Sequence, residues 1–322
     1  MSAEPIIEAE GLTRHYGQRV AVDHIGFSIS RGEVFGFLGP NGAGKSTTVR
    51  MLTGYIPPTS GTARVAGCDI VAEPVSARQH IGVVPEESSA YADLSVWQNI
   101  MLMGELHSVP RRRRTERGAE LTELFALADR HNQKGRDLSK GLRQRLMLCM
   151  ALVSDPEILF LDEPTTGLDV VSSHVIRDIV TRMNRERDMT VFVTTHNIEE
   201  AGDLCHRVGI IDQGRLVAID TPQALRGSID ARRSVEVRFA DRVVVISDLI
   251  DTNAEIVRLA DGFRIYTAQP GRLAQELATR ATNRGIEIAS LNTLTPSLEE
   301  VFLHITARAG APAPGRVRAD AG

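Results

Sequence analysis

A glycine-rich segment, Gly39 to Thr47 (GPNGAGKST), constrains what this chain can fold into more than any other feature. It follows an apolar run, Gly32 to Leu38, which predicts a buried strand, and it leads into a helix predicted at Ser46 to Leu52. Glycine lets the backbone curl so that N–H groups point at phosphate oxygens, and the helix N-terminus adds positive potential. In this setting the pattern G-x-x-x-x-G-K-[ST] predicts a phosphate-binding loop. Lys45 is expected to contact β/γ-phosphates and Ser46 to ligate Mg²⁺.

A second segment carries two adjacent carboxylates behind an apolar run. Ile158 to Leu161 predicts a buried strand, and Asp162 and Glu163 follow it directly. Such a strand delivers its last residues beside the phosphate loop, where Asp162 is expected to hold Mg²⁺ through water. Glu163 is a candidate general base for an attacking water. Taken alone, this pattern fits an ordinary strand that ends in acids equally well; the phosphate loop makes that alternative poor.

Strand-like and helix-like segments alternate along the first two-thirds of the chain. This alternation predicts the α/β class, with a largely parallel sheet covered by helices. Further strands are expected at residues 62–65, 81–84, 157–161 and 189–195, and a hairpin at 207–219 about Asp212-Gln213-Gly214. Helices are expected at residues 96–107, 118–128, 141–153, 170–187 and 198–205.

The pattern changes after about Arg226. Ser234 to Phe239 alternates strictly, and Asp261-Gly262 joins two predicted strands in a hairpin. A helix at 272–282, a strand at 286–291 and a last helix follow, with Thr295 as N-cap and Pro296 as first helical residue. These elements predict a small α+β domain at 232–306. The tail at 308–322, rich in Ala, Pro and Gly, is expected to be disordered.

Composition excludes several classes of protein. With 322 residues, 42% hydrophobic and 24% charged, the chain is expected to fold into about two domains. Its net charge of −4 gives no overall basic field for nucleic acid or an anionic membrane. The longest apolar run, Leu146 to Val153, is far shorter than a membrane span, and the first residues lack a basic signal-peptide region. The 3 cysteines lack paired spacing, which argues against a disulfide or zinc framework and favours the cytosol.

Further motifs resemble the nucleotide-binding subunit of an ATP-binding-cassette (ABC) transporter. Leu138 to Arg145 (LSKGLRQR) resembles the family's signature loop, and Asp162 to Asp169 (DEPTTGLD) resembles its second nucleotide motif running into the D-loop. Thr194-Thr195-His196 is similar to the segment that ends in the switch histidine, and Tyr16 stands where the family places an adenine-stacking aromatic. The resemblance covers about residues 4–225, with its elements in the family's order.

The resemblance implies a P-loop NTPase ABC cassette at 4–226, with a mixed sheet core and a helical subdomain at about 88–154. It implies ATP and Mg²⁺ as cofactors, with Glu163 and His196 as catalytic residues and Ser46, Asp162 and Glu86 as metal ligands. The residues expected to contact ATP are Tyr16, Gly39, Pro40, Asn41, Gly42, Ala43, Gly44, Lys45, Ser46, Thr47, Ser139 and Gly141.

The same resemblance implies partners. Two cassettes close face to face around ATP, so that Ser139 and Gly141 of one chain contact the γ-phosphate held by Lys45 of a second copy or another cassette. Leu294 to Leu303 resembles the ending of cassettes that serve ABC-2 type exporters, including drug-resistance and gliding-type systems. That ending implies a separate transmembrane permease and a peripheral position at the cytoplasmic face of the membrane.

The motifs depart from the family pattern at two places. Glu86 stands where the family usually has glutamine; a carboxylate still ligates Mg²⁺ but adds negative charge near ATP. Lys140 and Leu142 replace the glycine and glutamine of the signature, and Lys140 either pairs with ATP of the partner or faces solvent.

Other functions remain as alternatives. Cassette ATPases of DNA repair or chromosome structure carry long coiled coils, and no heptad run appears here. Translation factors normally join two cassettes in one chain, and a non-hydrolysing regulatory binder is disfavoured by Glu163 and His196. Arg111 to Arg114 is interpreted as a solvated helix start, because no aromatic residue interleaves with it. No nucleic acid partner is therefore expected.

Overall fold

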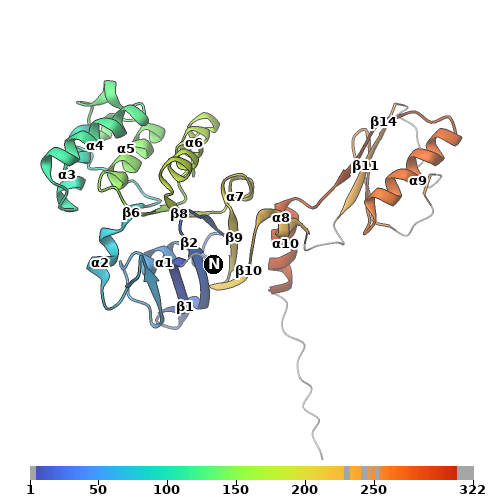
Figure 1. Ribbon diagram of the computed structural model, residues 1–322. Helices are drawn as coiled ribbons and strands as arrows, with labels where there is room; N and C mark the ends of the chain where they lie inside the picture. The colour runs from blue at the N-terminus through green and yellow to red at the C-terminus, as the bar shows by residue number, and fades with distance from the viewer. Residues whose placement is uncertain (1–4, 228–232, 241–245, 247–248, 251–253, 310–322) are drawn as a thin grey trace, which may run out of the picture. The chain divides into compact units, whose positions relative to one another are not determined.

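The computed structural model describes residues 5–227, 233–240, 246, 249–250 and 254–309 (Figure 1). Contacts divide the chain into two compact units, Met1–Asp220 and Thr221–Gly322. The sequence placed the change of pattern near Arg226. The division falls earlier because helix α8 (Pro222–Gly227) packs against helix α10 (Leu298–Ala309).

A six-stranded sheet, ordered β10-β9-β3-β8-β7-β6, forms the centre of the first unit. Its strands are β3 (Val34–Leu38), β6 (Ile81–Val84), β7 (Ile158–Asp162), β8 (Thr190–Thr195), β9 (Arg207–Asp212) and β10 (Arg215–Asp220). All neighbours pair in parallel except β9 and β10, the hairpin predicted about Asp212-Gln213-Gly214. Because β3 and β7 are central parallel strands, their carboxyl ends bring the phosphate loop and the two carboxylates to one edge.

A second sheet of four antiparallel strands is ordered β2-β1-β4-β5, and the sequence predicted only one of its strands, β4, at residues 62–65. Its strands are β1 (Pro5–Tyr16), β2 (Arg19–Ser30), β4 (Ser60–Val65) and β5 (Cys68–Asp69). Register shifts interrupt the pairing of β1 with β2 and break the period of two that identifies a strand in sequence. The alternation of segments predicted a largely parallel sheet, which holds for the six-stranded sheet alone. With the antiparallel sheet added, the unit as a whole is mixed, and this is what the family resemblance implied.

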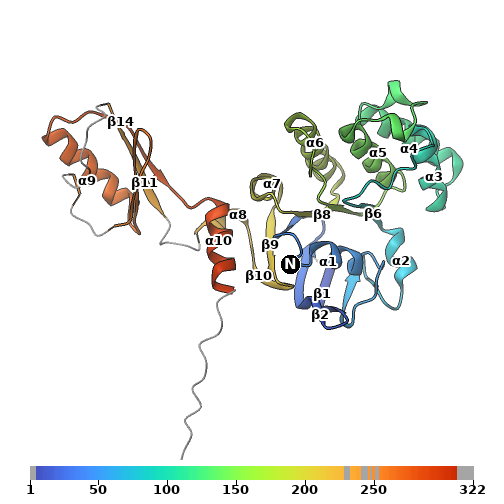
Figure 2. The same ribbon diagram turned by 180° about the vertical axis from the view of Figure 1, so that it is seen from behind.

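Helices cover these sheets and build a separate helical layer (Figures 1 and 2). Helices α1 (Lys45–Leu52), α2 (Pro74–Gln79), α6 (Val170–Arg187) and α7 (Ile198–Leu204) follow strands or the loops after them. The helical layer consists of α3 (Val96–Leu106), α4 (Arg111–Leu124), α5 (Lys140–Leu152) and the 3-10 turns Ala128–Arg130 and Gly135–Asp137. α4 begins at Arg111 rather than at Gly118, so the four consecutive arginines occupy its first turn, and three of them, Arg111–Arg113, are exposed.

The core between the two sheets contains a cluster of aromatic rings. Phe192 on β8 is fully buried, and its ring centroid lies 5.5–6.1 Å from four other phenylalanine rings. These neighbours come from three other strands: Phe27, Phe35, Phe37 and Phe160. The cluster thus joins β2 of the antiparallel sheet to the strands that carry the site.

The second unit contains an antiparallel sheet ordered β12-β13-β11-β14. Its strands are β11 (Ser234–Phe239), β12 (Ile256–Arg258), β13 (Gly262–Tyr266) and β14 (Ile288–Leu294). Helix α9 (Pro270–Asn283) buries Leu273 and Leu277 in a core shared with Val235 and Val237 of β11. This is the small α+β unit expected from the sequence, although β14 starts and ends later than predicted.

The start of the last helix corrects one expectation. Thr295 and Pro296 were predicted as N-cap and first helical residue, but α10 begins at Leu298. Ser297 is the cap instead: its Oγ accepts from the Glu300 N–H at 3.1 Å, and Glu300 Oε2 accepts from the Ser297 N–H at 3.0 Å. This reciprocal capping box satisfies two backbone donors at once, which a threonine cap at 295 would not do.

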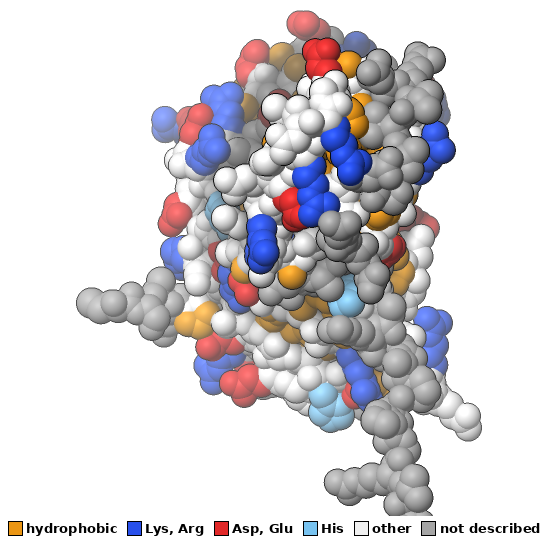
Figure 3. Space-filling view, turned by 90° about the vertical axis from the view of Figure 1, so that its right-hand side faces the viewer, with side chains coloured by type: hydrophobic (Ala, Val, Ile, Leu, Met, Phe, Trp, Pro, Cys, Tyr) orange, Lys and Arg blue, Asp and Glu red, His pale blue; other side chains and the backbone are white. Residues whose placement is uncertain are grey.

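Of the tail expected to be disordered at 308–322, residues 308 and 309 end α10 and the rest lies outside the described residues. Within the described part of the chain, no helix combines the length and apolar character needed to cross a bilayer. On the face drawn in Figure 3, the Lys and Arg side chains of the described residues are interspersed with Asp and Glu.

Truncation of the central ring should destabilise the first unit strongly. We expect Phe192→Ala to lower the free energy of unfolding by about 3–5 kcal/mol, because it opens a cavity among four rings. Urea unfolding followed by fluorescence reports on this unit, since the single tryptophan, Trp97, lies on α3. Val171→Ala, at a side chain that is 72% exposed, is the control and should change stability little. Equal stabilities of the two variants would contradict the role of the ring cluster.

Candidate nucleotide site

The loop between β3 and α1 has no room for side chains at two of its glycines. A Cβ at Gly39 would lie 2.4 Å from the Ile211 carbonyl oxygen, and one at Gly44 would lie 2.5 Å from that of Ala21. Gly44 also has φ of 111°, a conformation that other residues rarely adopt. The curled loop that the sequence predicted is therefore fixed by packing against β9 and β2, and its amides lead into the start of α1.

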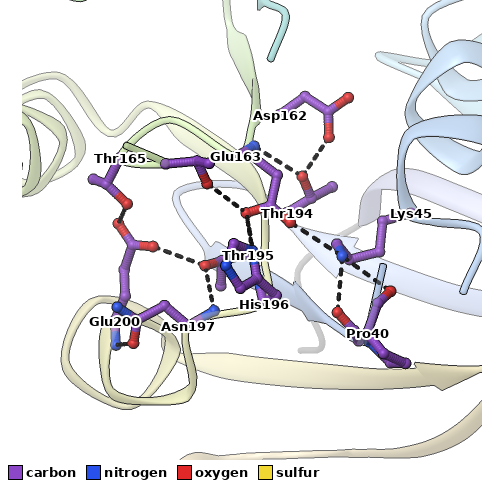
Figure 4. Close-up of polar contacts among 12 residues, drawn as sticks. Pro40, Lys45, Asp162, Glu163, Thr165, Thr194, Thr195, His196, Asn197 and Glu200 are labelled. Carbon is purple, nitrogen blue, oxygen red and sulfur yellow. Dashed lines mark hydrogen bonds and ion pairs between the residues drawn. The ribbon is translucent and has the colours of Figure 1, made fainter. Parts of the chain in front are cut away.

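Lys45 lies buried at the start of α1 and points into the loop (Figure 4). Its Nζ donates to the carbonyl oxygens of Gly39 at 2.8 Å and Pro40 at 3.3 Å. Nζ also forms an ion pair with Glu163 Oε1 at 3.1 Å, and both side chains are about 95% buried. Lys45, which is expected to bind phosphate, is thus paired with Glu163, which is expected to act as the general base.

Glu163 lies at the end of β7 in a left-handed conformation, with φ of 51°. Its N–H donates to the carbonyl and the Oγ1 of Thr194, both at 3.1 Å. Its Oε2 accepts from Thr166 Oγ1 at 3.0 Å and from His196 Nδ1 at 2.8 Å. Burial alone would raise the pKa of Glu163, but the Lys45 ammonium and His196 outweigh it and hold that pKa below its ordinary value. The side chain is therefore a carboxylate at neutral pH.

Asp162 and Ser46 present oxygen atoms to one another across the loop. Ser46 Oγ donates to Asp162 Oδ1 at 3.2 Å, and Thr194 Oγ1 donates to the same oxygen at 2.5 Å. Glu86, after β6, lines the same cavity as Ser46. A hydroxyl and carboxylates are the hard oxygen ligands that Mg²⁺ takes alongside substrate phosphates, so this donor set fits that ion.

Lys45, Glu163, Ser46 and Glu86 line a cavity of about 290 Å³. It is lined by most of the predicted residues: Tyr16, Asn41, Gly42, Gly44, Lys45, Ser46, Thr47, Glu86 and Glu163. Gly39, Pro40 and Ala43 belong to the same loop but do not line the cavity, and neither does His196. Asp162 lines a neighbouring cavity, to which Glu86 also contributes. Arg19 and Ala21 also line the first cavity and were missed, because they lie on β2, a strand that the sequence did not reveal.

Tyr16, the last residue of β1, is 44% exposed at this cavity. The guanidinium of Arg14 lies over its ring, 4.9 Å from the centroid, and Arg14 Nη1 donates to the Pro57 carbonyl at 2.7 Å. Arg14 therefore stabilises the orientation of the ring by a cation–π contact.

Ser139 and Gly141 do not line this cavity. Ser139 caps α5, and its Oγ accepts from the Leu142 N–H at 3.3 Å. A Cβ at Gly141 would lie 2.7 Å from Ser172 Oγ at the start of α6, so the signature glycine permits close packing of two helix starts. One chain thus does not bring its signature loop to its own phosphate loop.

A buried carboxylate that sequence reasoning missed links two loops of the site. Glu200, only 3% exposed, accepts from Thr165 Oγ1 at 2.7 Å and from Thr195 Oγ1 at 2.8 Å (Figure 4). Asn197 caps α7 and so holds Glu200 in its first turn. The acidic pair after a capping asparagine was the available signal.

The fold and this site define a P-loop ATPase: a glycine loop, a buried lysine and Glu163 surround one polar cavity, and Asp162 is hydrogen-bonded to Ser46 of its lining. A family model described as ABC transporter matches residues 22–166. The linearmycin resistance ATP-binding protein LnrL of Bacillus subtilis is 36% identical over 308 residues, spanning 94% of this chain and 99% of that protein. The chain belongs to the ATP-binding proteins of the ABC transporter family and is an ATPase cassette.

Other relatives match along nearly the whole chain. The daunorubicin/doxorubicin resistance ATP-binding protein DrrA of Streptomyces peucetius is 36% identical, over 98% of this chain and 96% of that protein. Nod factor export ATP-binding protein I of Ralstonia nicotianae is 34% identical, over 96% of each. The names of these relatives assign them to drug resistance and to Nod factor export.

Solved structures resemble the first unit. CbiO1 of Clostridium perfringens, part of an ABC transporter complex, has a TM-score of 0.64 and 26% identity, covering 70% of this chain and 92% of that one. The cassette MJ0796, solved as a dimer in a post-hydrolysis state with ADP and Pi, has a TM-score of 0.61 and 25% identity, covering 67% and 98%.

Removal of the Glu200 carboxylate should loosen the loops around Glu163 and His196. We expect Glu200→Ala to lower stability by about 1–3 kcal/mol, because it leaves the hydroxyls of Thr165 and Thr195 without their acceptor. Turnover should fall more than affinity for ATP, measured by steady-state hydrolysis and by titration with a fluorescent nucleotide. Glu199→Ala, at the exposed neighbouring position, is the matched control. Identical behaviour of both variants would refute this positioning role.

Proposed function

We propose that this chain hydrolyses ATP to power export of a substrate across the cytoplasmic membrane, through a separate ABC-2 type transmembrane partner. One observation carries the proposal: relatives named for drug resistance and Nod factor export match the chain over 94–98% of its length, including the C-terminal unit. The chain would act at the cytoplasmic face as a peripheral subunit. The substrate path would lie in the partner.

The geometry supports separate roles for the residues around the cavity: contact with the phosphates, with Mg²⁺ and with the adenine. The amides of Gly39 to Thr47 and the ammonium of Lys45 bind the β- and γ-phosphates, at the positive end of α1. Ser46, Asp162 and Glu86 would hold Mg²⁺, which would neutralise charge on the phosphates. Tyr16, with Arg14 behind its ring, stacks on the adenine.

Glu163 and His196 would activate water. Binding of phosphate gives the Lys45 ammonium a stronger anionic partner than one carboxylate, so Lys45 turns from Glu163 toward the phosphates. Glu163 Oε1 is then free to accept the proton of the attacking water. His196 Nδ1 must carry a proton to donate to a carboxylate, so it orients Glu163. When Nε2 on the opposite edge of the ring is protonated as well, it would donate to the γ-phosphate.

The second half of each site would come from another cassette. Ser139 and Gly141 lie at the start of α5, outside the cavity of their own chain. The N-terminus of α5 presents backbone N–H groups and a positive potential, which suit the γ-phosphate bound by a second copy or a different cassette. Hydrolysis would therefore need two cassettes.

Replacement of the proposed base should separate binding from hydrolysis. We expect Glu163→Gln to lower ATP turnover by about 10²–10⁴-fold and to leave the affinity for ATP within a few-fold, because the amide cannot accept the proton. Phosphate release measures the first quantity and a fluorescent-nucleotide titration the second. Glu199→Gln makes the same exchange at an exposed site and should hydrolyse normally. Normal turnover in Glu163→Gln would refute the assignment.

Export itself is tested through the partner. We expect gentle detergent extraction of native membranes to recover this chain with a stoichiometric protein that spans the membrane several times, identified by mass spectrometry. The partner should increase ATP turnover when both are reconstituted in vesicles. Recovery of the chain alone, without any membrane protein, would overturn the proposal of a transporter subunit.

A further inference from the structure

Two cations line the nucleotide cavity, and they differ in their partners. Lys45 forms an ion pair with Glu163 and donates to two carbonyl groups of the loop. Arg19, the first residue of β2, is the other lining cation, and it is exposed. Within the part of the chain that the structure describes, no hydrogen bond or ion pair engages its guanidinium. The cavity therefore contains a positive charge to which none of the motif residues is committed.

A tight hairpin holds Arg19 beside Tyr16. Tyr16 ends β1, Arg19 begins β2, and the two are direct partners in the antiparallel pairing. The next pair, His15 with Val20, continues this register, and the nearest register shift lies beyond it at Arg14. Directly opposed residues of an antiparallel pair share one face, with Cβ atoms about 5 Å apart. Arg19 thus stands next to the ring on which the adenine is proposed to stack.

From this position the guanidinium of Arg19 reaches the phosphate loop. The atom nearest to a Cβ built on Gly42 would be Arg19 Nη2, at 3.8 Å. Gly42 lies in the middle of the loop, before Lys45, which is proposed to hold the β- and γ-phosphates. Because Arg19 lies close both to the adenine end of the cavity and to the loop, it faces the part of a nucleotide that joins the base to the β-phosphate.

The charges of the lining favour an anion at Arg19. Four lining side chains are charged: Arg19, Lys45, Glu86 and Glu163. Glu163 neutralises Lys45, and Glu86 adds a negative charge where the family usually has a neutral glutamine. Without Arg19 the lining would carry a net negative charge, which repels a polyphosphate. Arg19 offsets this charge and leaves the loop amides and Lys45 to attract the nucleotide.

We propose that the guanidinium of Arg19 binds the α-phosphate, the group that ATP, ADP and AMP share. A guanidinium pairs with phosphate oxygens through two parallel N–H···O bonds, which the single ammonium of a lysine cannot form. Arg14 does not take this role, because the Pro57 carbonyl and the Tyr16 ring already hold its guanidinium. This assignment rests on the proposed function, since its ligand is the nucleotide, and it adds a residue that lies outside the sequence motifs.

A contact with the α-phosphate is made by substrate and product alike. ATP, the transition state of its hydrolysis and ADP all carry this group, so the contact stabilises each of them to a similar extent. Such uniform binding lowers KM without raising kcat. Arg19 is thus a binding residue rather than a catalytic one, and loss of its side chain should weaken affinity without slowing the chemical step.

Competition binding across a series of ligands tests the assignment. Displacement of a fluorescent ATP analogue from the full chain gives dissociation constants for ATP, ADP, AMP and adenosine. We expect Arg19→Gln to raise the first three by a common factor on the order of tenfold, because each loses one charge-assisted contact. Adenosine, which has no phosphate, should bind as it does to the wild type. KM for hydrolysis should rise by a similar factor, while kcat stays within about twofold.

Arg112→Gln is the matched control, since it removes the same charge from a side chain that is 91% exposed on α4, outside the cavity. It should bind all four ligands as the wild type does. Unchanged binding of adenosine to Arg19→Gln shows that its cavity is folded.

The pattern of loss decides the outcome. A loss confined to ATP, or to ATP and ADP, would place the guanidinium at the γ- or β-phosphate, and a loss that includes adenosine would place it at the ribose or base. Each of these results, or no loss at all, would overturn the assignment and leave the ATPase function in place. A wild-type chain that binds no nucleotide would overturn the proposed function as well.

Discussion

The buried ion pair between Lys45 and Glu163 organises the whole site. One partner opens α1 and the other ends β7, so their 3.1 Å contact requires that the two strands β3 and β7 stop at the same edge of one sheet. Two buried charges are stable only when they neutralise each other and their remaining positions are satisfied. Carbonyl oxygens of the loop, Thr166 and His196 supply those further contacts. A polyphosphate that enters the cavity would compete directly with the Glu163 carboxylate for the Lys45 ammonium.

The ring cluster around Phe192 shows how the core supports that edge. Phe35 and Phe37 lie on β3, which leads into the phosphate loop, while Phe160 lies on β7, which ends in the two carboxylates. Packing of rigid rings therefore fixes the distance between the strands from which both partners of the ion pair come. The same phenylalanine residues therefore stabilise the core and fix the positions of Lys45 and Glu163 relative to each other.

Much of this arrangement was predictable from the sequence, wherever a local pattern of residues allows only one backbone structure. The phosphate loop, the strand before Asp162 and Glu163, and the hairpin at Gln213-Gly214 were all predicted, because glycine positions and short apolar runs restrict the backbone directly. β1 and β2 were not predicted, since register shifts disturb their alternation. Arg19 at the cavity was missed for the same reason. The cap at Ser297 depended on a choice between neighbouring residues that only the reciprocal contact with Glu300 decides.

The left-handed backbone at Glu163 has a consequence for how variant libraries at this position are read. At φ of 51° a side chain with two branches at Cβ meets the preceding and following peptide groups, whereas Gly, Asn and unbranched polar residues are better accommodated. Inactivity of a valine, isoleucine or threonine variant would then combine lost chemistry with a distorted turn between β7 and the D-loop. Only replacement residues that can adopt this left-handed conformation test the role of the carboxylate by itself. Few of the variants in a saturation library at Glu163 are therefore informative about the chemistry.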